Sequence, residues 1–199
     1  MESTNLASFA LIAAGAFLAG GMNALAGGGT FFSFPALLAA GVPPVMANAS
    51  NTVALWPASI SSAWAYRREA MRHGKWAVLL VIVSVIGGLT GGLLLLATSN
   101  AAFSKLIPWL LLTATTLFAF SGQISRGVAA VKKRLGKTET GNPGGPGGAL
   151  LQLIVAIYGG FFGAGMGILT LAALAIQGVE DIQELNGLKN LTSAVNYTV

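Results

Sequence analysis

The sequence predicts an all-α, polytopic membrane helix bundle with two homologous repeat units and broken, glycine-rich helices. Its composition excludes an ordinary soluble domain, because 54% of the residues are hydrophobic, 9% are charged and the mean hydropathy is +0.74. A soluble domain carries about 25% charged residues. The 27 glycines and an internal similarity between the two parts of the chain complete the prediction.

Long stretches without charge supply the membrane spans. Residues 3–66, 76–104, 106–125 and 149–179 contain no charged side chain. One helix that crosses the bilayer needs about 20 apolar residues. The lipid bilayer is therefore the expected surrounding of most of the chain.

A shift of 138 residues relates the two units without a gap. It places a glycine cluster on a glycine cluster and an asparagine on an asparagine, with Gly21 on Gly159, Ala26 on Ala164, Gly27 on Gly165, Gly29 on Gly167 and Asn48 on Asn186. Such a duplication is typical of repeat architectures and of secondary transporters. We divide the chain into a first unit (1–125), a cytoplasmic basic and Gly/Pro-rich linker (126–148) and a second unit (149–199).

Both glycine clusters are predicted to interrupt helices. As one helix, residues 6–40 would extend about 52 Å, against a hydrocarbon core of about 30 Å. The expected breakpoints are Gly27, Gly28 and Gly29 in the first unit and Gly163, Gly165 and Gly167 in the second. Unwound backbone at membrane depth is tolerated when it is buried or lines a cavity. We predict that these glycines bind the substrate, because free amide N–H groups at a broken helix would face an anion. We expect the two clusters to approach each other near mid-membrane, and we favour a parallel over an inverted relation of the units.

The charged loops predict orientation. Nine of the 11 lysines and arginines lie within residues 67–75 and 126–137, so both loops are expected in the cytoplasm. The acidic residues Glu180, Asp181 and Glu184 are then predicted on the opposite side, within 177–184. For Gly87 to Gly92, whose spacing suits closely packed helices, we predict a packing role.

Candidate binding residues are polar side chains inside predicted spans. Lys189 is the single ionisable group well inside a span, and such a group is a functional hypothesis by default. Asn186 and Asn190 flank it, and each unit places three polar residues within about one helical turn. The predicted cavity is lined by Asn48, Asn51, Thr52, Asn186, Lys189 and Asn190, with Lys189 as the anchor of a small anionic substrate. Alternatively, Lys189 snorkels or pairs with Glu184 or Asp181, and the asparagines hydrogen-bond between helices.

Other functions are less compatible with the composition. The predicted spans contain no histidine, aspartate, glutamate or cysteine, so we expect no enzyme, no catalytic residue, no metal site and no cofactor. Basic residues lie between apolar runs, which argues against nucleic acid. A non-transporting membrane scaffold or a channel-like pore stays an alternative to a carrier, and a homo-oligomer is compatible with the sequence.

Four segments resemble the TauE/SafE family of transporters. They are GGMNALAGGGT at 20–30, ANASNTVALWP at 47–57, GGFFGAGMG at 159–167 and LNGLKNL at 185–191. The resemblance implies a multi-pass permease or exporter of the inner (plasma) membrane for small anions such as sulfite or organosulfonates. A second unit as long as the first would need about two further spans, so we expect the chain to be C-terminally truncated relative to the family.

Overall fold

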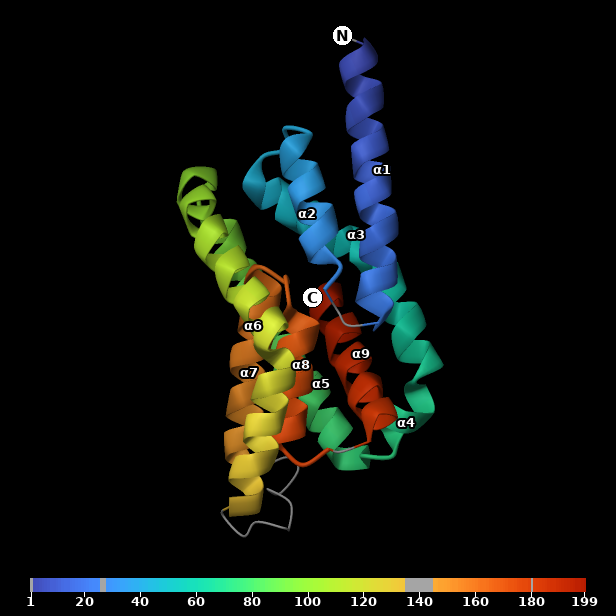
Figure 1. Cartoon of the computed structure of the whole chain (residues 1–199), viewed down its shortest axis with the longest axis vertical. Helices are drawn as coiled ribbons and strands as arrows, with labels where there is room; N and C mark the ends of the chain where they lie inside the picture. The colour runs from blue at the N-terminus through green and yellow to red at the C-terminus, as the bar shows by residue number, and fades with distance from the viewer. Residues whose placement is uncertain (1, 26–27, 135–144, 180) are drawn as a thin grey trace.

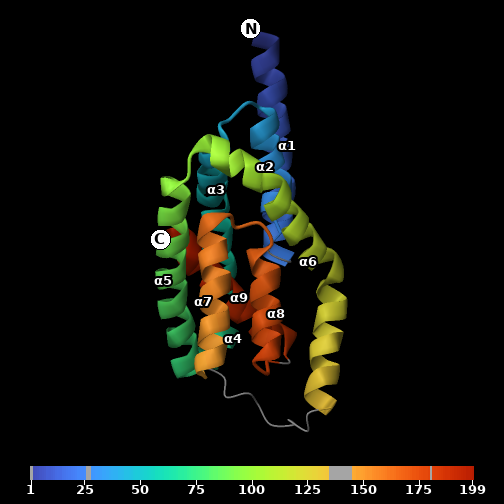
Figure 2. The ribbon, with the colours of Figure 1, turned by 90° about the vertical axis from the view of Figure 1, so that its left-hand side faces the viewer.

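A computed structural model of the chain describes residues 2–25, 28–134, 145–179 and 181–199. The described part is helical and contains no strand, which confirms the predicted all-α class. Its helices are α1 (Glu2–Leu25), α2 (Thr30–Ala39), α3 (Pro44–Ala65), α4 (Arg67–Met71), α5 (Gly74–Ala97), α6 (Asn100–Arg134), α7 (Pro146–Phe161), α8 (Met166–Ile176) and α9 (Ile182–Thr198). They form an elongated bundle in which α7 and α9 pack against α5, and α8 lies between α7 and α6 (Figures 1 and 2).

The surface of this bundle is apolar. Within the described part, two helical stretches are long and apolar enough to cross a membrane, Leu6–Asn23 in α1 and all of α5. Their outward side chains include Phe17, which is 84% exposed, and Leu96, which is 75% exposed. Large apolar side chains on such helices are suited to contact with lipid. The fold is that of a membrane helix bundle.

The first glycine cluster turns the chain back on itself. A Cβ atom added at Gly15 of α1 would lie 2.8 Å from Cβ of Ala36 and 3.1 Å from the carbonyl oxygen of Phe32. Both neighbours belong to α2, so the two helices pack against each other. In Figure 1, α1 descends from the N-terminus and α2 ascends beside it. Helices α1 and α2 therefore form a helical hairpin.

Helices α7 and α8 form a second hairpin. At its open end, a Cβ atom added at Gly148 would lie 2.2 Å from Oε1 of Gln177. Near its tip, a Cβ atom added at Gly159 would lie 2.0 Å from Sδ of Met166. Figure 2 shows α7 rising to this tip and α8 returning beside it, while α6 descends next to α8.

The two hairpins enter the bundle from opposite ends (Figures 1 and 2). Helices α1, α2 and α3 run down, up and down in Figure 1, whereas α7, α8 and α9 run up, down and up. Helix α3 begins at Pro44 and α9 at Ile182, so these starts are 138 residues apart. The preference for a parallel relation is wrong, because each glycine segment returns the chain instead of carrying it across. The duplication itself stays a prediction.

Helices α3 and α9 pack side by side in opposite directions. The indole Nε1 of Trp56 donates a hydrogen bond of 2.8 Å to Oγ1 of Thr198, near the end of α9. Near the start of α9, a Cβ atom added at Gly187 would lie 2.9 Å from the backbone nitrogen of Ala70 and 3.2 Å from the carbonyl oxygen of Tyr66. The two ends of α9 are thus fixed against α3 and the α3–α4 junction.

Glycines bring α5 and α7 into backbone contact. A Cβ atom added at Gly91 would lie 2.2 Å from the carbonyl oxygen of Ile157, and one added at Gly160 would lie 2.4 Å from that of Gly88. Small residues permit this approach of helices in membranes. The predicted packing role of this glycine run is confirmed for Gly87, Gly88 and Gly91, whereas a Cβ atom at Gly92 would meet nothing within 4 Å.

The acidic start of α9 lies on the same side of the bundle as the basic loop 67–75. Glu184 at the start of α9 lies 3.3 Å from the guanidinium of Arg72 and 2.9 Å from Nε2 of His73. The prediction that 177–184 faces the side opposite to 67–75 is therefore wrong. It assumed that residues 149–179 cross once, but they enter and return. Acidic residues contribute little to membrane topology, so their position is compatible with the positive-inside rule.

The α5–α7 contact predicts unequal effects of two adjacent alanine substitutions. Gly91→Ala should lower the unfolding temperature in detergent, because its Cβ would overlap backbone at a cost of about 1–3 kcal/mol. Gly92→Ala is the matched control. It should be neutral or stabilising by up to about 1 kcal/mol, because alanine favours the helix. Equal shifts in the two variants would contradict the packing assignment.

The corrected topology predicts a labelling pattern in a chain without native cysteine. Single cysteines at Lys75 and Gln183 should react with a membrane-impermeant maleimide from one side. A cysteine at Ala101, in the first turn of α6 just after α5 ends, should react from the other side. Labelling of position 183 together with position 101 would refute this arrangement of the α7–α8 hairpin.

Candidate functional site

The first helix break lies where the sequence predicts it. Helix α1 ends at Leu25 and α2 begins at Thr30, while Gly27 lies outside the described residues. Gly28 and Gly29 are buried. A Cβ atom added at Gly29 would lie 2.4 Å from the carbonyl oxygen of Ala19. Glycine is therefore required for the close return of the chain past α1.

The second break lies between Phe161 and Met166. Gly163 and Gly165 have φ angles of 79° and 74°, a left-handed conformation that glycine adopts without steric cost. The tip is held by Tyr158, whose hydroxyl donates a hydrogen bond of 2.8 Å to the carbonyl of Ala164. Gly167 is buried within the first turn of α8. The predicted loss of helical structure at both glycine clusters is confirmed.

Two asparagines on α3 connect the breaks. Asn48 and Asn51 are 1% and 2% exposed and lie three residues apart on one face of the helix. The Asn51 side chain donates to Oγ1 of Thr30 at 3.0 Å and accepts a hydrogen bond from Ser33, both on α2. The Asn48 side chain donates at 3.0 Å to the carbonyl of Phe161, the last residue of α7. One helix thus holds both hairpins.

Aromatic packing brings the same two segments together. The ring of Phe34, one turn into α2, meets the ring of Phe162 edge to face with centroids 5.5 Å apart. Phe103 of α6 packs on Phe162 from another side, with centroids 6.2 Å apart. The Phe34 and Phe162 side chains are fully buried. The two broken segments therefore meet inside the bundle.

Helix α9 carries the second predicted triplet. Lys189 is 1% exposed and Asn190 is 3% exposed, whereas Asn186 is partly exposed. Among the described residues, neither Nζ of Lys189 nor Nδ2 of Asn190 has a hydrogen-bond partner. Buried donors of this kind are costly unless a partner binds. The lysine is thus the strongest candidate for contact with a ligand.

Acidic residues near the start of α9 are engaged elsewhere. Glu184 contacts Arg72 and His73, not Lys189 as one interpretation of the sequence expected. The Asp181 carboxylate caps α9 by accepting hydrogen bonds from the backbone amides of Gln183 and Glu184. These bonds, that of Glu184 most, hold the pKa of Asp181 below its usual range. No described carboxylate forms an ion pair with Lys189.

A groove of about 240 Å³ lies beside the C-terminal end of α9. Thr52 lines it together with Gly88, Gly92 and Asn196. Thr52 itself donates a hydrogen bond to the carbonyl of Asn48. None of the other five predicted cavity residues lines this groove, so a common cavity for the six stays a prediction.

Several buried polar residues were not predicted from the sequence. Asn23 of α1 donates to Ser59 of α3 at 3.2 Å, and Asn196 of α9 donates to the carbonyl of Ala156 at 2.9 Å. Gln152 and Thr170 are 1% and 0% exposed. Asn23, Gln152 and Thr170 are polar residues inside stretches without charge, and this pattern could have identified them from the sequence.

The hydrogen bonds of α3 predict a large effect of Asn51→Leu. This change removes the donor to the buried Thr30 hydroxyl, and a buried polar group left without a partner costs about 1–3 kcal/mol. It also removes one acceptor of the Ser33 hydroxyl, which can still donate to the carbonyl of Gly29 at 3.2 Å. Asn190→Leu serves as the matched control, because its Nδ2 has no partner. Thermal unfolding in detergent without added anion should show a clear loss for the first variant and little change for the second. Equal losses would contradict the bridging role of Asn51.

Comparison with known proteins places the chain in a family. Residues 12–199 match the family described as sulfite exporter TauE/SafE. A probable membrane transporter protein of Haemophilus influenzae is 30% identical over 163 residues, which cover 81% of this chain and 60% of the relative. Another, ORF9 of Sinorhizobium sp, is 26% identical over 180 residues, which cover 86% of this chain and 64% of the relative. No solved structure matches the chain.

The match extends through both hairpins and through Lys189, and the chain spans less than two thirds of the length of these relatives. It therefore belongs to the TauE/SafE family.

Proposed function

We propose that the protein moves small anions across the cell's inner membrane, and that Lys189 anchors the anion. The observation that carries this proposal is the Nζ atom of Lys189, which is buried and without a hydrogen-bond partner among the described residues. A buried, unpaired ammonium costs several kcal/mol. A bound anion would offset that cost by supplying the missing opposite charge.

A comparison of Lys189 with the corresponding residue of the first unit, Asn51, supports a ligand-binding role of the lysine. The shift of 138 residues places Lys189 on Asn51, and it places Ile168 and Leu171 on Thr30 and Ser33. Asn51 is fully engaged with those two hydroxyls. The corresponding residues Ile168 and Leu171 are apolar, so Lys189 cannot form the hydrogen bonds that Asn51 forms. An exogenous partner is the simplest way to satisfy it.

The arrangement of the hairpins also suits transport. Secondary transporters place their sites where discontinuous helices of inverted repeats meet near the middle of the membrane. Here the two hairpins enter from opposite ends and are held together by Asn48 and Asn51. The amide of Asn190 and the backbone amide of Gly165 are further candidate donors to the anion. The backbone amide of Gly163 already donates to the carbonyl of Tyr158 at 3.4 Å. Sulfite and organosulfonates are the proposed substrate class, in accord with the family's description.

The charge of Lys189 can be tested with Lys189→Met, which keeps the length of the side chain. Without anion, this variant should unfold at a higher temperature than the wild type, because it removes an uncompensated buried charge. Sulfite should stabilise the wild type by about 2.7 kcal/mol at 100 times its Kd, and should not stabilise the variant. The variant should also lose sulfite uptake in proteoliposomes.

Lys105→Met is the control, because Lys105 is exposed on α6. It should keep both the stabilisation by sulfite and the uptake. If Lys189→Met lowers stability and sulfite still stabilises it as it does the wild type, the lysine has a structural role and the anchor assignment is wrong.

A further inference from the structure

Thr170, in the middle of α8, differs from other helical threonines in its hydrogen bonding. Inside a helix, a threonine hydroxyl commonly donates to the carbonyl four residues earlier. This bond is present at Thr52, Thr90, Thr98, Thr113, Thr192 and Thr198. Thr170 is 0% exposed, yet its Oγ1 has no partner among the described residues. Its hydroxyl is therefore available to a ligand.

The register of the α7–α8 hairpin shows what Thr170 faces. Gly148 packs on Gln177 at the open end, and Gly159 packs on Met166 near the tip. These contacts at both ends fix which side of α7 faces α8 along the whole hairpin. We call the row of residues on each facing side its inner stripe. Residues four apart on a helix share a face, so the positions between the two contacts face each other.

Gln152 lies on the inner stripe of α7, four residues after Gly148. Thr170 lies on the inner stripe of α8, four residues after Met166. Gln152 is 1% exposed, and its Oε1 also lacks a partner among the described residues. The interior of the hairpin thus holds two unsatisfied polar side chains, one from each helix.

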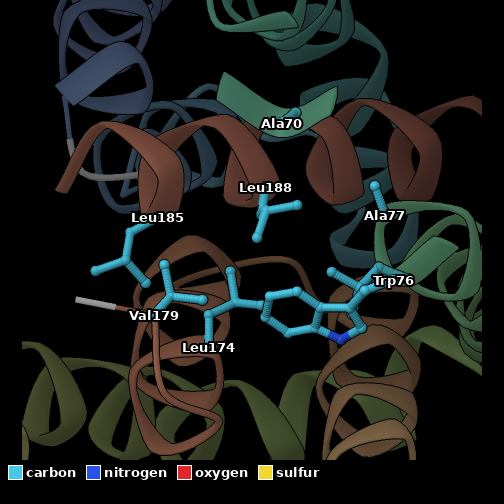
Figure 3. Packing of buried hydrophobic residues seen from close by; sticks show 8 residues of the cluster. Ala70, Trp76, Ala77, Leu174, Val179, Leu185 and Leu188 are labelled. Carbon is cyan, nitrogen blue, oxygen red and sulfur yellow. The ribbon is translucent and has the colours of Figure 1, made fainter. Parts of the chain in front are cut away.

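Helix α9 covers this part of the hairpin with the stripe that carries Lys189. Near the tip, a Cβ atom added at Gly163 would lie 3.9 Å from the ring of Tyr197. At the other end, Leu185 packs in one cluster with Leu174 and Val179 (Figure 3). Lys189 is four residues after Leu185 and eight before Tyr197, so it lies between these contacts on the same face.

We propose that Thr170 and Gln152 are ligands of the anion together with Lys189, so that α7, α8 and α9 each contribute one side chain to the site. This inference rests on the proposed function and extends it, because Thr170 and Gln152 lie outside the asparagine and glycine positions that the sequence suggested. Each of the three side chains is at least nine-tenths buried and has an unpartnered polar atom. That atom can donate in Lys189 and Thr170, whereas in Gln152 it is the acceptor Oε1. Gln152 donates to the anion once its carboxamide turns by about 180°, which puts the N–H donors of Nε2 in the place of Oε1.

The donor set indicates the class of anion. An ammonium group offers three N–H donors, a hydroxyl one O–H and a carboxamide two N–H. Donors from three helices suit an anion with several acceptor oxygens, such as the SO₃ group of sulfite or a sulfonate. A halide ion accepts hydrogen bonds at a single centre, so it satisfies three donors only where all three point to one position. The site should therefore bind a small oxyanion more tightly than chloride.

Thr170→Val tests the hydroxyl because it keeps the shape of the side chain. The purified full chain in detergent is titrated with sodium sulfite or sodium methanesulfonate, with sodium chloride at equal ionic strength as reference, and the shift in unfolding temperature gives the Kd. Thr170→Val should weaken sulfite binding about tenfold or more, as expected for the loss of a hydrogen bond to a charged group. Its stability without anion should be unchanged or higher.

Thr192→Val is the matched control. Thr192 is 1% exposed, but its hydroxyl is engaged with the carbonyls of Leu188 and Lys189. This variant should keep the wild-type affinity for sulfite. Unchanged binding in Thr170→Val, with binding lost in Lys189→Met, would overturn the role of Thr170 and leave the lysine anchor standing. Unchanged binding in both variants would overturn the two proposals together, and equal stabilisation by sulfite and chloride would overturn the oxyanion assignment.

Discussion

The structure depends on satisfying backbone and side-chain polar groups where two helices break inside an apolar bundle. In lipid, water cannot supply the missing hydrogen bonds, so protein groups must supply them. Helix α3 does this for both breaks, with Asn51 at the start of α2 and Asn48 at the end of α7. The positions of the two hairpins are consequently coupled through one helix face.

Much of this fold follows from the sequence, because length and glycine content limit what residues 6–40 can do. One straight helix would be too long for the membrane, and the glycines mark where it ends. The pairing of Asn48 with Asn51 on one face follows from the helical period. The direction of the chain after each break does not follow from composition, since a crossing segment and a returning segment have the same hydropathy. The predicted place of Glu184 failed for this reason.

The candidate site was predicted less completely than the fold. Lys189 could be predicted from the sequence, because it is a single lysine inside a predicted membrane span. Thr170 and Gln152 are neutral, and threonine is common in membrane helices with its hydroxyl bonded to its own backbone. Only the contacts of the structure distinguish Thr170 from Thr192. The two predicted units thus differ in chemistry, since Asn51 is hydrogen-bonded to α2 and Lys189 has no partner among the described residues.

The glycine contact between α5 and α7 has a consequence for motion. Backbones that approach this closely at Gly88, Gly91 and Gly160 leave little free volume between the two helices, so we expect α5 and α7 to move together. We therefore treat α5 and α7 as one packed unit. If Lys189 binds a ligand, we expect a path to it to open by displacement of α8 or α9 relative to α5 and α7. The left-handed residues Gly163 and Gly165, which join α7 to α8, are the natural pivot.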